Sequence, residues 1–173
     1  MLFWCKSCLN MSTRPRIEFN EDKICNACQW KKEKESLNWT KREEELINIL
    51  KKFNFNKDFN CIVPVSGGKD GSYIAHTLKT KYKVKPLCIT VNPHLATTLG
   101  QKNLKNFGKS GFDLIEINPH YETLRKLNLI GFQELGFPYY GWLTAIQTAV
   151  IRLAVSLNIP LIFYGEDGEV EYG

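Results

Sequence analysis

The sequence predicts an α/β fold, in which a parallel sheet carries helices on both faces, preceded by a small metal-binding module. From Asn60 onward, short apolar runs alternate with segments of helical periodicity, which is typical of strands joined by helical crossovers. Nearer the N-terminus, four of the six cysteines form two matched Cys-x-x-Cys pairs. With 173 residues, of which 43% are apolar, the chain can bury a core, so we expect one main domain and a small appendage.

The paired cysteines predict a zinc site. The pairs Cys5/Cys8 and Cys25/Cys28 are separated by 16 residues, which is the spacing of a four-thiolate zinc ribbon or knuckle. Redox dithiols or unrelated buried cysteines are the alternative. Four sulfurs leave no open position for substrate, so the zinc is expected to be structural and to fold residues 1–36, which hold too little apolar material to fold unaided.

A linker and a connecting helix are expected over residues 37–59, between this module and the sheet. Residues 31–39 are highly charged and are predicted to be irregular. Thr40 and Glu43 have the spacing of a capping box at the start of a helix. Apolar residues at helical spacing follow them, namely Leu46, Ile47, Leu50 and Phe53.

The main domain is expected to occupy residues 60–173. Four strands are predicted, at 61–65, 86–91, 114–117 and 161–164, and four helices, at 70–82, 97–108, 121–135 and 141–157. Because strand, helix and strand repeat in order, the strands are expected to be parallel. Pro64 removes a ladder donor, which is tolerable near the end of a strand. The most apolar stretch, 142–157, is shorter than the roughly 18 to 20 residues of a membrane span and is predicted to be a buried helix.

The first predicted strand leads into a glycine-rich loop, Ser66-Gly-Gly-Lys-Asp-Gly-Ser72. Ligands bind at the carboxyl ends of strands in open α/β sheets, and the N–H groups of a helix start attract anions. Gly67 and Gly68 would let the backbone close around a phosphate, and Lys69 adds a positive charge. The loop matches neither the Walker A pattern nor G-x-G-x-x-G. An ordinary glycine turn before a helix is the alternative.

The loop resembles the pyrophosphate loop, S-G-G-x-D-S, of the N-type ATP pyrophosphatases, which implies their Rossmann-like fold of the adenine nucleotide α-hydrolase type. That family has serine where this chain has Gly71, so Ser66 and Ser72 are the hydroxyls expected to meet pyrophosphate. Further motifs run in order along nearly the whole chain: Cys5-x-x-Cys8, Thr13-Arg-Pro15, Cys25-Asn-Ala-Cys28, PVSGGKDGSY, KPLCITVNP, Thr98-x-Gly100-x-x-Asn103, Tyr164-Gly-Glu166 and Glu171-Tyr-Gly173. Together they resemble the N-acetyl sugar amidotransferases of bacterial surface-polysaccharide and flagellar-glycan synthesis, which are linked to acetamidino sugars such as modified pseudaminic acids.

This resemblance implies an ATP-dependent reaction. ATP would adenylate the acetamido oxygen of a nucleotide-activated N-acetyl sugar, and ammonia would displace AMP to leave an acetamidino group. The sequence offers no cysteine suited to a glutaminase, so the ammonia would come from a separate glutaminase subunit.

The resemblance also implies roles for particular residues. Lys69 and Asp70 would be catalytic, because Lys69 stabilises charge on pyrophosphate and Asp70 helps to hold Mg²⁺. The residues implied to bind ATP and its pyrophosphate are Ser66, Gly67, Gly68, Lys69, Asp70, Gly71, Ser72, Val91 and Gly165. Those implied to bind Mg²⁺ or substrate are Thr98, Asn103 and Glu166. The acidic run 166–171 is equally consistent with a solvated loop, and the aromatic stretch 137–142 with either core or a sugar-facing wall.

The composition argues against nucleic acid and membrane partners. The net charge of +5 is mild, and Lys31, Lys32 and Lys34 are offset by Glu33 and Glu35. The N-terminus lacks the basic segment and apolar core of a secretory signal, so we expect a cytoplasmic protein.

Two other functions are open. A tRNA thiolase of the same superfamily would need catalytic cysteines at the active end of the sheet, whereas Cys61 and Cys88 lie in apolar runs and are predicted to be core residues. A non-catalytic module that binds zinc and nucleotide is the other. Members of the amidotransferase family are much longer than this chain, so we expect a fragment or a domain completed by a second chain.

Overall fold

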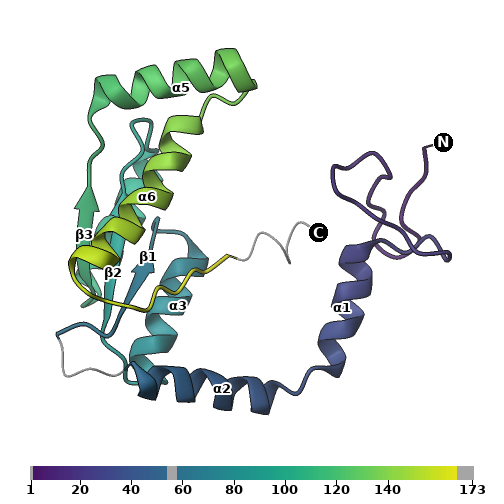
Figure 1. The fold of residues 1–173 in the computed structure, drawn as a ribbon, viewed down its shortest axis with the longest axis horizontal. Helices are drawn as coiled ribbons and strands as arrows, with labels where there is room; N and C mark the ends of the chain where they lie inside the picture. The colour runs from purple at the N-terminus through teal and green to yellow at the C-terminus, as the bar shows by residue number, and fades with distance from the viewer. Residues whose placement is uncertain (1, 54–57, 167–173) are drawn as a thin grey trace. The chain divides into compact units, whose positions relative to one another are not determined.

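The computed structural model describes residues 2–53 and 58–166, which belong to two compact units (Figure 1). Of the described residues, one unit contains 2–48 and 166, and the other contains 49–53 and 58–165. The division falls within helix α2 (Trp39–Lys52), so the connecting helix contributes residues to both units.

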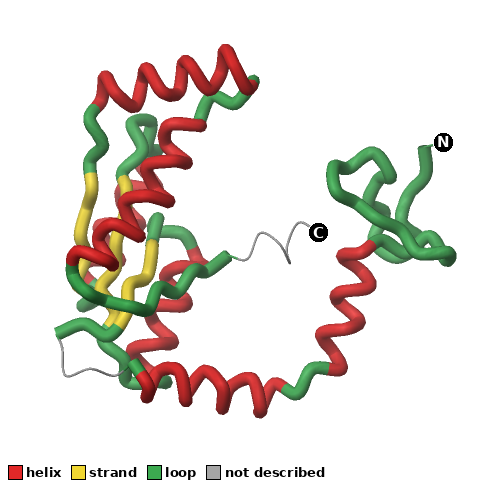
Figure 2. Tube along the Cα trace, in the orientation of Figure 1, coloured by secondary structure: helices red, strands yellow, loops and turns green. Residues whose placement is uncertain are grey.

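The second unit is built on a three-stranded sheet with the order β1-β2-β3 (Figure 2). Its elements in chain order are β1 (Cys61–Pro64), α3 (Lys69–Thr80), β2 (Pro86–Val91), α4 (Thr98–Lys109), β3 (Asp113–Ile117), α5 (Tyr121–Leu135) and α6 (Tyr140–Ser156). Both strand pairs are parallel, and Cys88 of β2 is aligned with Val63 of β1 and Leu114 of β3. The parallel α/β architecture expected from the alternation of elements is therefore confirmed.

The predicted fourth strand is reduced to a single pairing. Ile162 forms one parallel bridge with Ile62. The Ile62 N–H donates to the Leu161 carbonyl at 2.9 Å, and the Phe163 N–H donates to the Ile62 carbonyl at 2.9 Å. The next donor of β1 on this edge would be that of Pro64, which has no N–H. The proline therefore ends the ladder before a full strand forms, and the segment 161–163 lies beside β1 on the edge away from β2.

Alternate residues of the strands supply two apolar cores. On one face, Cys61 and Cys88 pack with side chains of α3 and α4. On the opposite face, Ile62 and Ile89 pack with side chains of α6. Helices thus cover both faces, as predicted, and the prediction that Cys61 and Cys88 are core residues is confirmed, since both are fully buried.

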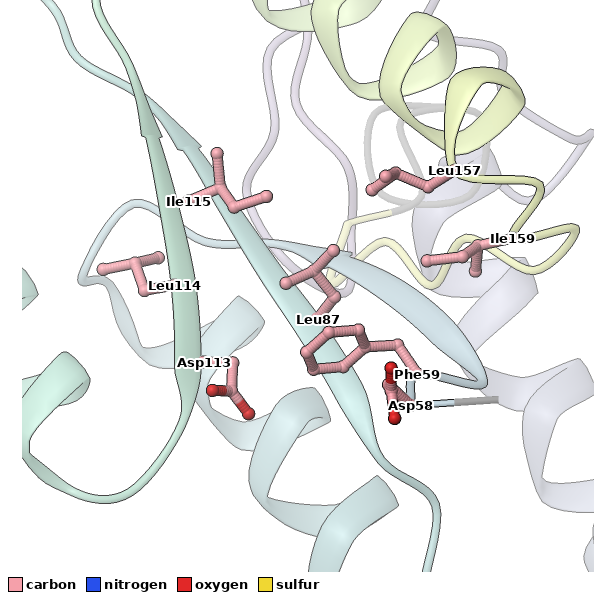
Figure 3. A pocket seen from close by; sticks show the side chains of 8 residues that line it. All are labelled: Asp58, Phe59, Leu87, Asp113, Leu114, Ile115, Leu157 and Ile159. Carbon is pink, nitrogen blue, oxygen red and sulfur yellow. The ribbon is translucent and has the colours of Figure 1, made fainter. Parts of the chain in front are cut away.

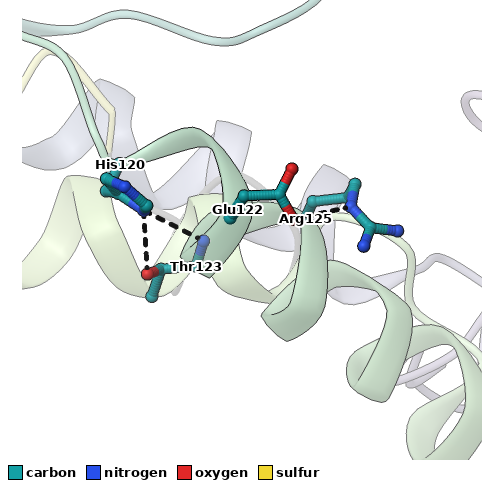
Figure 4. A network of polar contacts seen from close by, with 4 residues as sticks. All are labelled: His120, Glu122, Thr123 and Arg125. Atoms are coloured by element: carbon teal, nitrogen blue, oxygen red, sulfur yellow. Dashed lines mark hydrogen bonds and ion pairs between the residues drawn. The ribbon is translucent and has the colours of Figure 1, made fainter.

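Helices α5 and α6 form a hairpin that packs closely through two glycines. A Cβ atom at Gly141 would lie 2.6 Å from the Cβ of Leu127, and one at Gly131 would collide with Tyr140. At the start of α5, His120 acts as the helix cap, because its Nδ1 accepts a hydrogen bond from the Thr123 N–H at 3.4 Å (Figure 4).

The first turn of α5 also carries an ion pair. The Arg125 Nε lies 3.4 Å from a carboxylate oxygen of Glu122, one helical turn away (Figure 4). Both side chains are about half exposed, so the pair contributes little to stability.

The prediction that 142–157 is a buried helix is only partly right. Val150 lies against the sheet and is buried, whereas Ile151 and Val155 are 53% and 75% exposed. Phe137 and Tyr139, in the turn between α5 and α6, are also exposed. Of the two alternatives for the aromatic stretch, core therefore does not hold for this part, because the hairpin packs through its glycines and leaves the turn outside.

Two predictions about the first unit are wrong. Residues 31–39 were predicted to be irregular, but residues 31–36 belong to helix α1 (Asn26–Ser36). Lysine and glutamate are good helix formers even where the helix has no apolar face to bury. Helix α2 begins at Trp39, and the Asn38 side chain accepts a hydrogen bond from the Lys41 N–H at 3.0 Å. Asn38 is therefore the cap, and Thr40 lies inside the helix rather than opening a capping box.

Candidate functional site

The four paired cysteines of the first unit converge on one point. The Sγ atoms of Cys5, Cys8, Cys25 and Cys28 all lie within 4.8 Å of one another. The Cys5–Cys28 separation is 3.9 Å and the Cys8–Cys25 separation is 3.5 Å. Tetrahedral zinc with bonds of about 2.3 Å holds its sulfur ligands about 3.8 Å apart. The cluster could therefore hold a metal ion such as zinc, as the spacing predicts.

Tight turns bring the sulfurs together. The Leu9 N–H donates to the Cys5 carbonyl at 3.1 Å, and Leu9 takes a left-handed conformation with φ of 61°. The second pair follows a similar turn, in which Lys23 has φ of 60°. Cys25 then stands at the start of α1, so that Cys28 falls within its first turn. Each Cys-x-x-Cys segment thus presents both sulfurs on one side of a bend.

The surroundings of the cluster shift the thiol pKa values of Cys5 and Cys8 in opposite directions. Burial raises the pKa of Cys5, but backbone hydrogen bonds from Cys25, Cys8 and Ser7 stabilise its thiolate and bring the pKa down to about 6. A backbone hydrogen bond from Asn10 lowers the pKa of Cys8, but burial and the neighbouring sulfurs raise it to about 12. One thiolate is therefore favoured without a metal, while a second needs a cation to offset the repulsion between sulfurs.

In the second unit, the glycine-rich loop joins β1 to the N-terminus of α3. Gly68 is the N-cap of α3 with φ of −78°, and glycine has no side chain with which to cap the N–H groups of the first turn. Gly67 has φ of 80°, a conformation that favours glycine. The Lys69 Nζ lies 2.6 Å from an oxygen of Asp70, and these side chains are 88% and 44% exposed. The loop therefore presents backbone donors and a positive side chain at the carboxyl edge of the sheet.

Close packing explains one glycine of the loop, Gly71, and a second glycine that lies against it, Gly165. A Cβ atom at Gly71 would lie 2.6 Å from the Pro64 carbonyl oxygen, so a serine would not fit at this position without a shift of the backbone. The hydroxyl of the next residue, Ser72, donates to the Gly68 carbonyl at 2.7 Å. A Cβ atom at Gly165 would lie 2.8 Å from the carbonyl carbon of Asp70, which places Gly165 directly against the loop.

Two other predicted residues can be placed relative to the loop. A Cβ atom on Gly67 would lie 3.3 Å from the Asn103 Cβ of α4, so Asn103 adjoins the loop. Val91 is the buried last residue of β2. Because β1 lies between β2 and the segment 161–163, the loop leaves the sheet where the strand order reverses, which is where open α/β sheets bind ligands.

Other predicted residues are less closely placed. Thr98 is exposed and is the first residue of α4. The cap of this helix is Thr97, whose Oγ1 accepts a hydrogen bond from the Gly100 N–H at 3.1 Å. Ser66 is exposed at the start of the loop, and Glu166 is exposed after Gly165. The other acidic residues of the run 166–171 and the motif 171–173 lie outside the described residues.

A polar cluster at the same edge of the sheet was not predicted. The Asn92 Nδ2 donates to Glu116 at 3.0 Å and to Asn118 at 3.0 Å. These residues line a cleft of about 680 Å³ between α4 and β3. The sequence holds one signal of it, since both β2 and β3 are followed by Asn-Pro, at 92–93 and 118–119.

A larger cavity, of about 730 Å³, lies at the amino ends of the strands (Figure 3). Apolar side chains such as Phe59, Leu87 and Ile159 line most of it, together with the carboxylates of Asp58 and Asp113. Leu87 and Asp113 stand near the amino ends of their strands, so this cavity is remote from the loop.

Comparison with known proteins adds one relative. No family profile matches the sequence. The chain is 31% identical over 125 residues to an uncharacterized protein of Methanocaldococcus jannaschii, and the likeness covers 69% of this chain and 44% of that protein. The chain therefore spans less than half the length of this relative. Within the described residues, no helix combines the length and apolar character needed to cross a bilayer.

Proposed function

We propose that the second unit binds ATP through the loop 66–72 and that the chain is part of an ATP-dependent sugar amidotransferase. The observation that carries this proposal is the loop itself, which leaves β1 where the strand order reverses and leads into the N-terminus of α3, whose N-cap is a glycine. Backbone donors at a helix N-terminus favour phosphate, and an adjacent lysine adds to that preference.

The ion pair between Lys69 and Asp70 suggests how the binding of ATP and the binding of Mg²⁺ are coupled. In the protein alone, these two side chains neutralise each other across 2.6 Å. An ATP phosphate would compete for the ammonium group of Lys69, which would free the Asp70 carboxylate to bind Mg²⁺, a cation that prefers oxygen ligands. Lys69 and the loop N–H groups would then stabilise the charge that develops on the departing pyrophosphate.

The reaction proposed for the loop has two steps. The acetamido oxygen of a nucleotide-activated N-acetyl sugar attacks the α-phosphorus of ATP and releases pyrophosphate. Ammonia, from a separate glutaminase subunit, then adds to the imidate carbon and AMP departs with the former amide oxygen, leaving an acetamidino group. ATP suits this chemistry, because an amide oxygen is a poor leaving group until it is adenylated.

The burial of the remaining cysteines favours the amidotransferase over the tRNA thiolase. Burial raises the pKa of Cys61 to about 12, and burial together with nearby Asp113 raises that of Cys88 to about 12. Neither thiol is accessible as a nucleophile at neutral pH. The four-cysteine cluster is proposed to bind Zn²⁺ in a structural role, since a closed set of four sulfurs leaves no position for substrate.

The test measures ATP binding and turnover separately. Isothermal titration calorimetry with ATP and Mg²⁺ is expected to show binding that Lys69→Ala weakens and that Lys126→Ala, on the exposed side of α5, leaves unchanged. Release of AMP and pyrophosphate is then assayed with ammonium and a panel of UDP- and CMP-linked N-acetyl sugars. ATP-dependent AMP release with one sugar supports the amidotransferase, whereas a chain that does not bind ATP contradicts the proposal.

A further inference from the structure

The loops that follow β2 and β3 are tied together at the carboxyl edge of the sheet. The Asn92 N–H donates to the Ile117 carbonyl at 2.9 Å, and the His94 ring contacts the Pro119 carbonyl at 3.3 Å. The His94 ring also stacks on Tyr121, with ring centroids 4.8 Å apart. These contacts hold the rim of the cleft between α4 and β3 in one arrangement.

The hydrogen bonds of Asn92 determine what the rim offers to a ligand. Its Nδ2 donates to a Glu116 carboxylate oxygen and to the Asn118 Oδ1, each at 3.0 Å. A carboxylate only accepts, so the orientation of both amides follows from these bonds. The cluster keeps two acceptor atoms, the Asn92 Oδ1 and the second Glu116 oxygen, and one donor group, the Asn118 Nδ2 with its two N–H bonds. Acceptors and a donor side by side suit hydroxyl and N-acyl groups on a sugar ring.

The opposite wall of the cleft is basic. Lys105 and Lys109 stand one turn apart on α4 and both line the cleft, with Leu104, Gly108 and Leu114 as its apolar floor. Paired ammonium groups at this spacing would attract a phosphate. Leu104 also adjoins the nucleotide loop, since a Cβ atom on Gly67 would lie 2.9 Å from the Leu104 nitrogen. The cleft and the loop therefore share one wall.

We propose that the cleft between α4 and β3 binds a glycosyl phosphate, with the sugar ring on Asn92, Glu116 and Asn118 and the phosphate on Lys105 and Lys109. This inference rests on the proposed function, because it gives the acceptor sugar a site beside the ATP loop. A ribose phosphate of a nucleotide has similar chemistry, so the test separates the two.

The test is a titration of the ¹⁵N-labelled chain, followed by NMR, with N-acetylglucosamine 1-phosphate, UDP-N-acetylglucosamine, UDP and ATP, each to millimolar concentration. The glycosyl phosphates are expected to shift the amides of the cleft residues. ATP is expected to shift the loop 66–72 instead. If ATP or UDP alone shifts the cleft amides and displaces N-acetylglucosamine 1-phosphate, the cleft belongs to a nucleotide and the inference is wrong.

Two variants test the two walls. Asn118→Asp keeps the acceptor for Asn92 but replaces the donor by a carboxylate oxygen, so affinity for both glycosyl phosphates is expected to fall at least about tenfold. Asn106→Asp, on α4 outside the cleft, introduces the same charge and is expected to leave affinity unchanged.

The basic wall is tested by the double variant Lys105→Gln with Lys109→Gln, which is expected to weaken binding of the phosphorylated sugars. The control, Lys102→Gln with Lys126→Gln, removes the same charge and is expected to leave this binding unchanged.

The outcomes separate this inference from the proposed function. Binding of a glycosyl phosphate in the cleft by a chain that does not bind ATP would support the cleft and contradict the amidotransferase. ATP binding at the loop without any cleft shift from either sugar would contradict the cleft and leave the amidotransferase standing. Equal losses in the variants and their charge-matched controls would show a general electrostatic effect and would also contradict the cleft.

Discussion

Individual residues determine how closely the glycine-rich loop 66–72 approaches the sheet. Gly71 lies where a side chain would meet the Pro64 carbonyl, and Gly165 lies against the backbone of Asp70 and Gly71. The loop therefore departs from the S-G-G-x-D-S pattern for a steric reason, because a serine at position 71 would press on β1. The Ser72 hydroxyl, at the next position, bonds within the loop to Gly68.

Gly71→Ala is expected to destabilise the second unit by about 1 to 3 kcal/mol, which is the usual cost of overpacking. The control is Gly108→Ala on α4, where a Cβ atom would lie at an ordinary 3.7 Å from Leu114 and alanine improves helix propensity. Urea unfolding of both variants measures the difference. Equal stability of the two variants would contradict the close approach.

The affinity of the cysteine cluster for zinc is expected to fall in two stages as the pH falls. Zinc binding requires thiolates, so protons compete for the sulfurs. The pKa of Cys5 lies below the ordinary value near 9, at about 6, so this residue stays deprotonated until the pH falls through 6. The pKa of Cys8 lies above the ordinary value, at about 12, so its proton competes throughout the neutral range. Zinc affinity should therefore fall gradually from pH 9 to 6 and more steeply below 6.

A chromogenic chelator that competes for zinc measures this dependence. Cys5→Ser and Cys8→Ser are expected to lower the zinc content. The control is Cys88→Ser, in the core of the other unit, which should leave the zinc affinity of the folded protein unchanged. A zinc affinity that is constant between pH 8 and 5 would contradict thiolate ligation.

At the scale of elements, the length of the fourth strand depends on one missing donor. The residues of β1 that face the segment 161–163 are Ile62 and Pro64, and only Ile62 has an N–H to donate. The segment 161–164, which has the apolar pattern of a strand, therefore forms one bridge with β1 instead of a ladder. The segment nevertheless places Gly165 against the backbone of the loop at Asp70 and Gly71, although it forms only one bridge.

Pro64→Val is expected to extend this ladder by one hydrogen bond, from the new N–H to the Phe163 carbonyl. Stability should change little, because a bond that contributes about 1 kcal/mol is offset by the greater freedom of the unfolded chain without proline. The readout is hydrogen exchange, in which the amide at position 64 should be protected. Pro138→Val, in the turn between α5 and α6, supplies the comparison, and rapid exchange at both positions would show that the proline does not limit the strand.

At the scale of the whole molecule, two units have separate sources of stability. Among the described residues of the first unit, only Cys5 and Cys25 are buried, and neither α1 nor α2 has a buried residue, so a metal ion held by the four cysteines would be its main source of order. The second has apolar cores on both faces of its sheet. Leu129, Phe132 and Val155 of the α5–α6 hairpin are nevertheless exposed, which is a large apolar surface for a small unit.

Removal of zinc by a chelator is expected to unfold residues of the first unit and to leave the second folded. In ¹⁵N spectra, amides of residues 2–36 should collapse to random-coil positions, while those of the three strands keep their shifts. Return of the spectrum on adding zinc is the control for irreversible damage. Loss of all structured signals together would show that the units fold as one.

The sequence by itself determined the features that depend on near neighbours along the chain. The alternation of strands and helices, the matched cysteine pairs and the loop before α3 are local patterns, and the structure has the parallel sheet and the converged sulfurs that they predict. The glycine-rich loop could be placed for the same reason, because the end of a strand and the start of a helix are both visible in the sequence.

Only the tertiary structure decided the features that depend on register and packing between distant segments. Asn92 meets Asn118 because β2 and β3 are aligned so that both end at one edge, and no local pattern encodes that alignment. Asn103 adjoins Gly67 because α4 crosses the sheet beside the loop. The exposure of Ile151 and Val155 likewise depends on which elements cover α6, since an apolar sequence shows what a helix can bury but not what it meets.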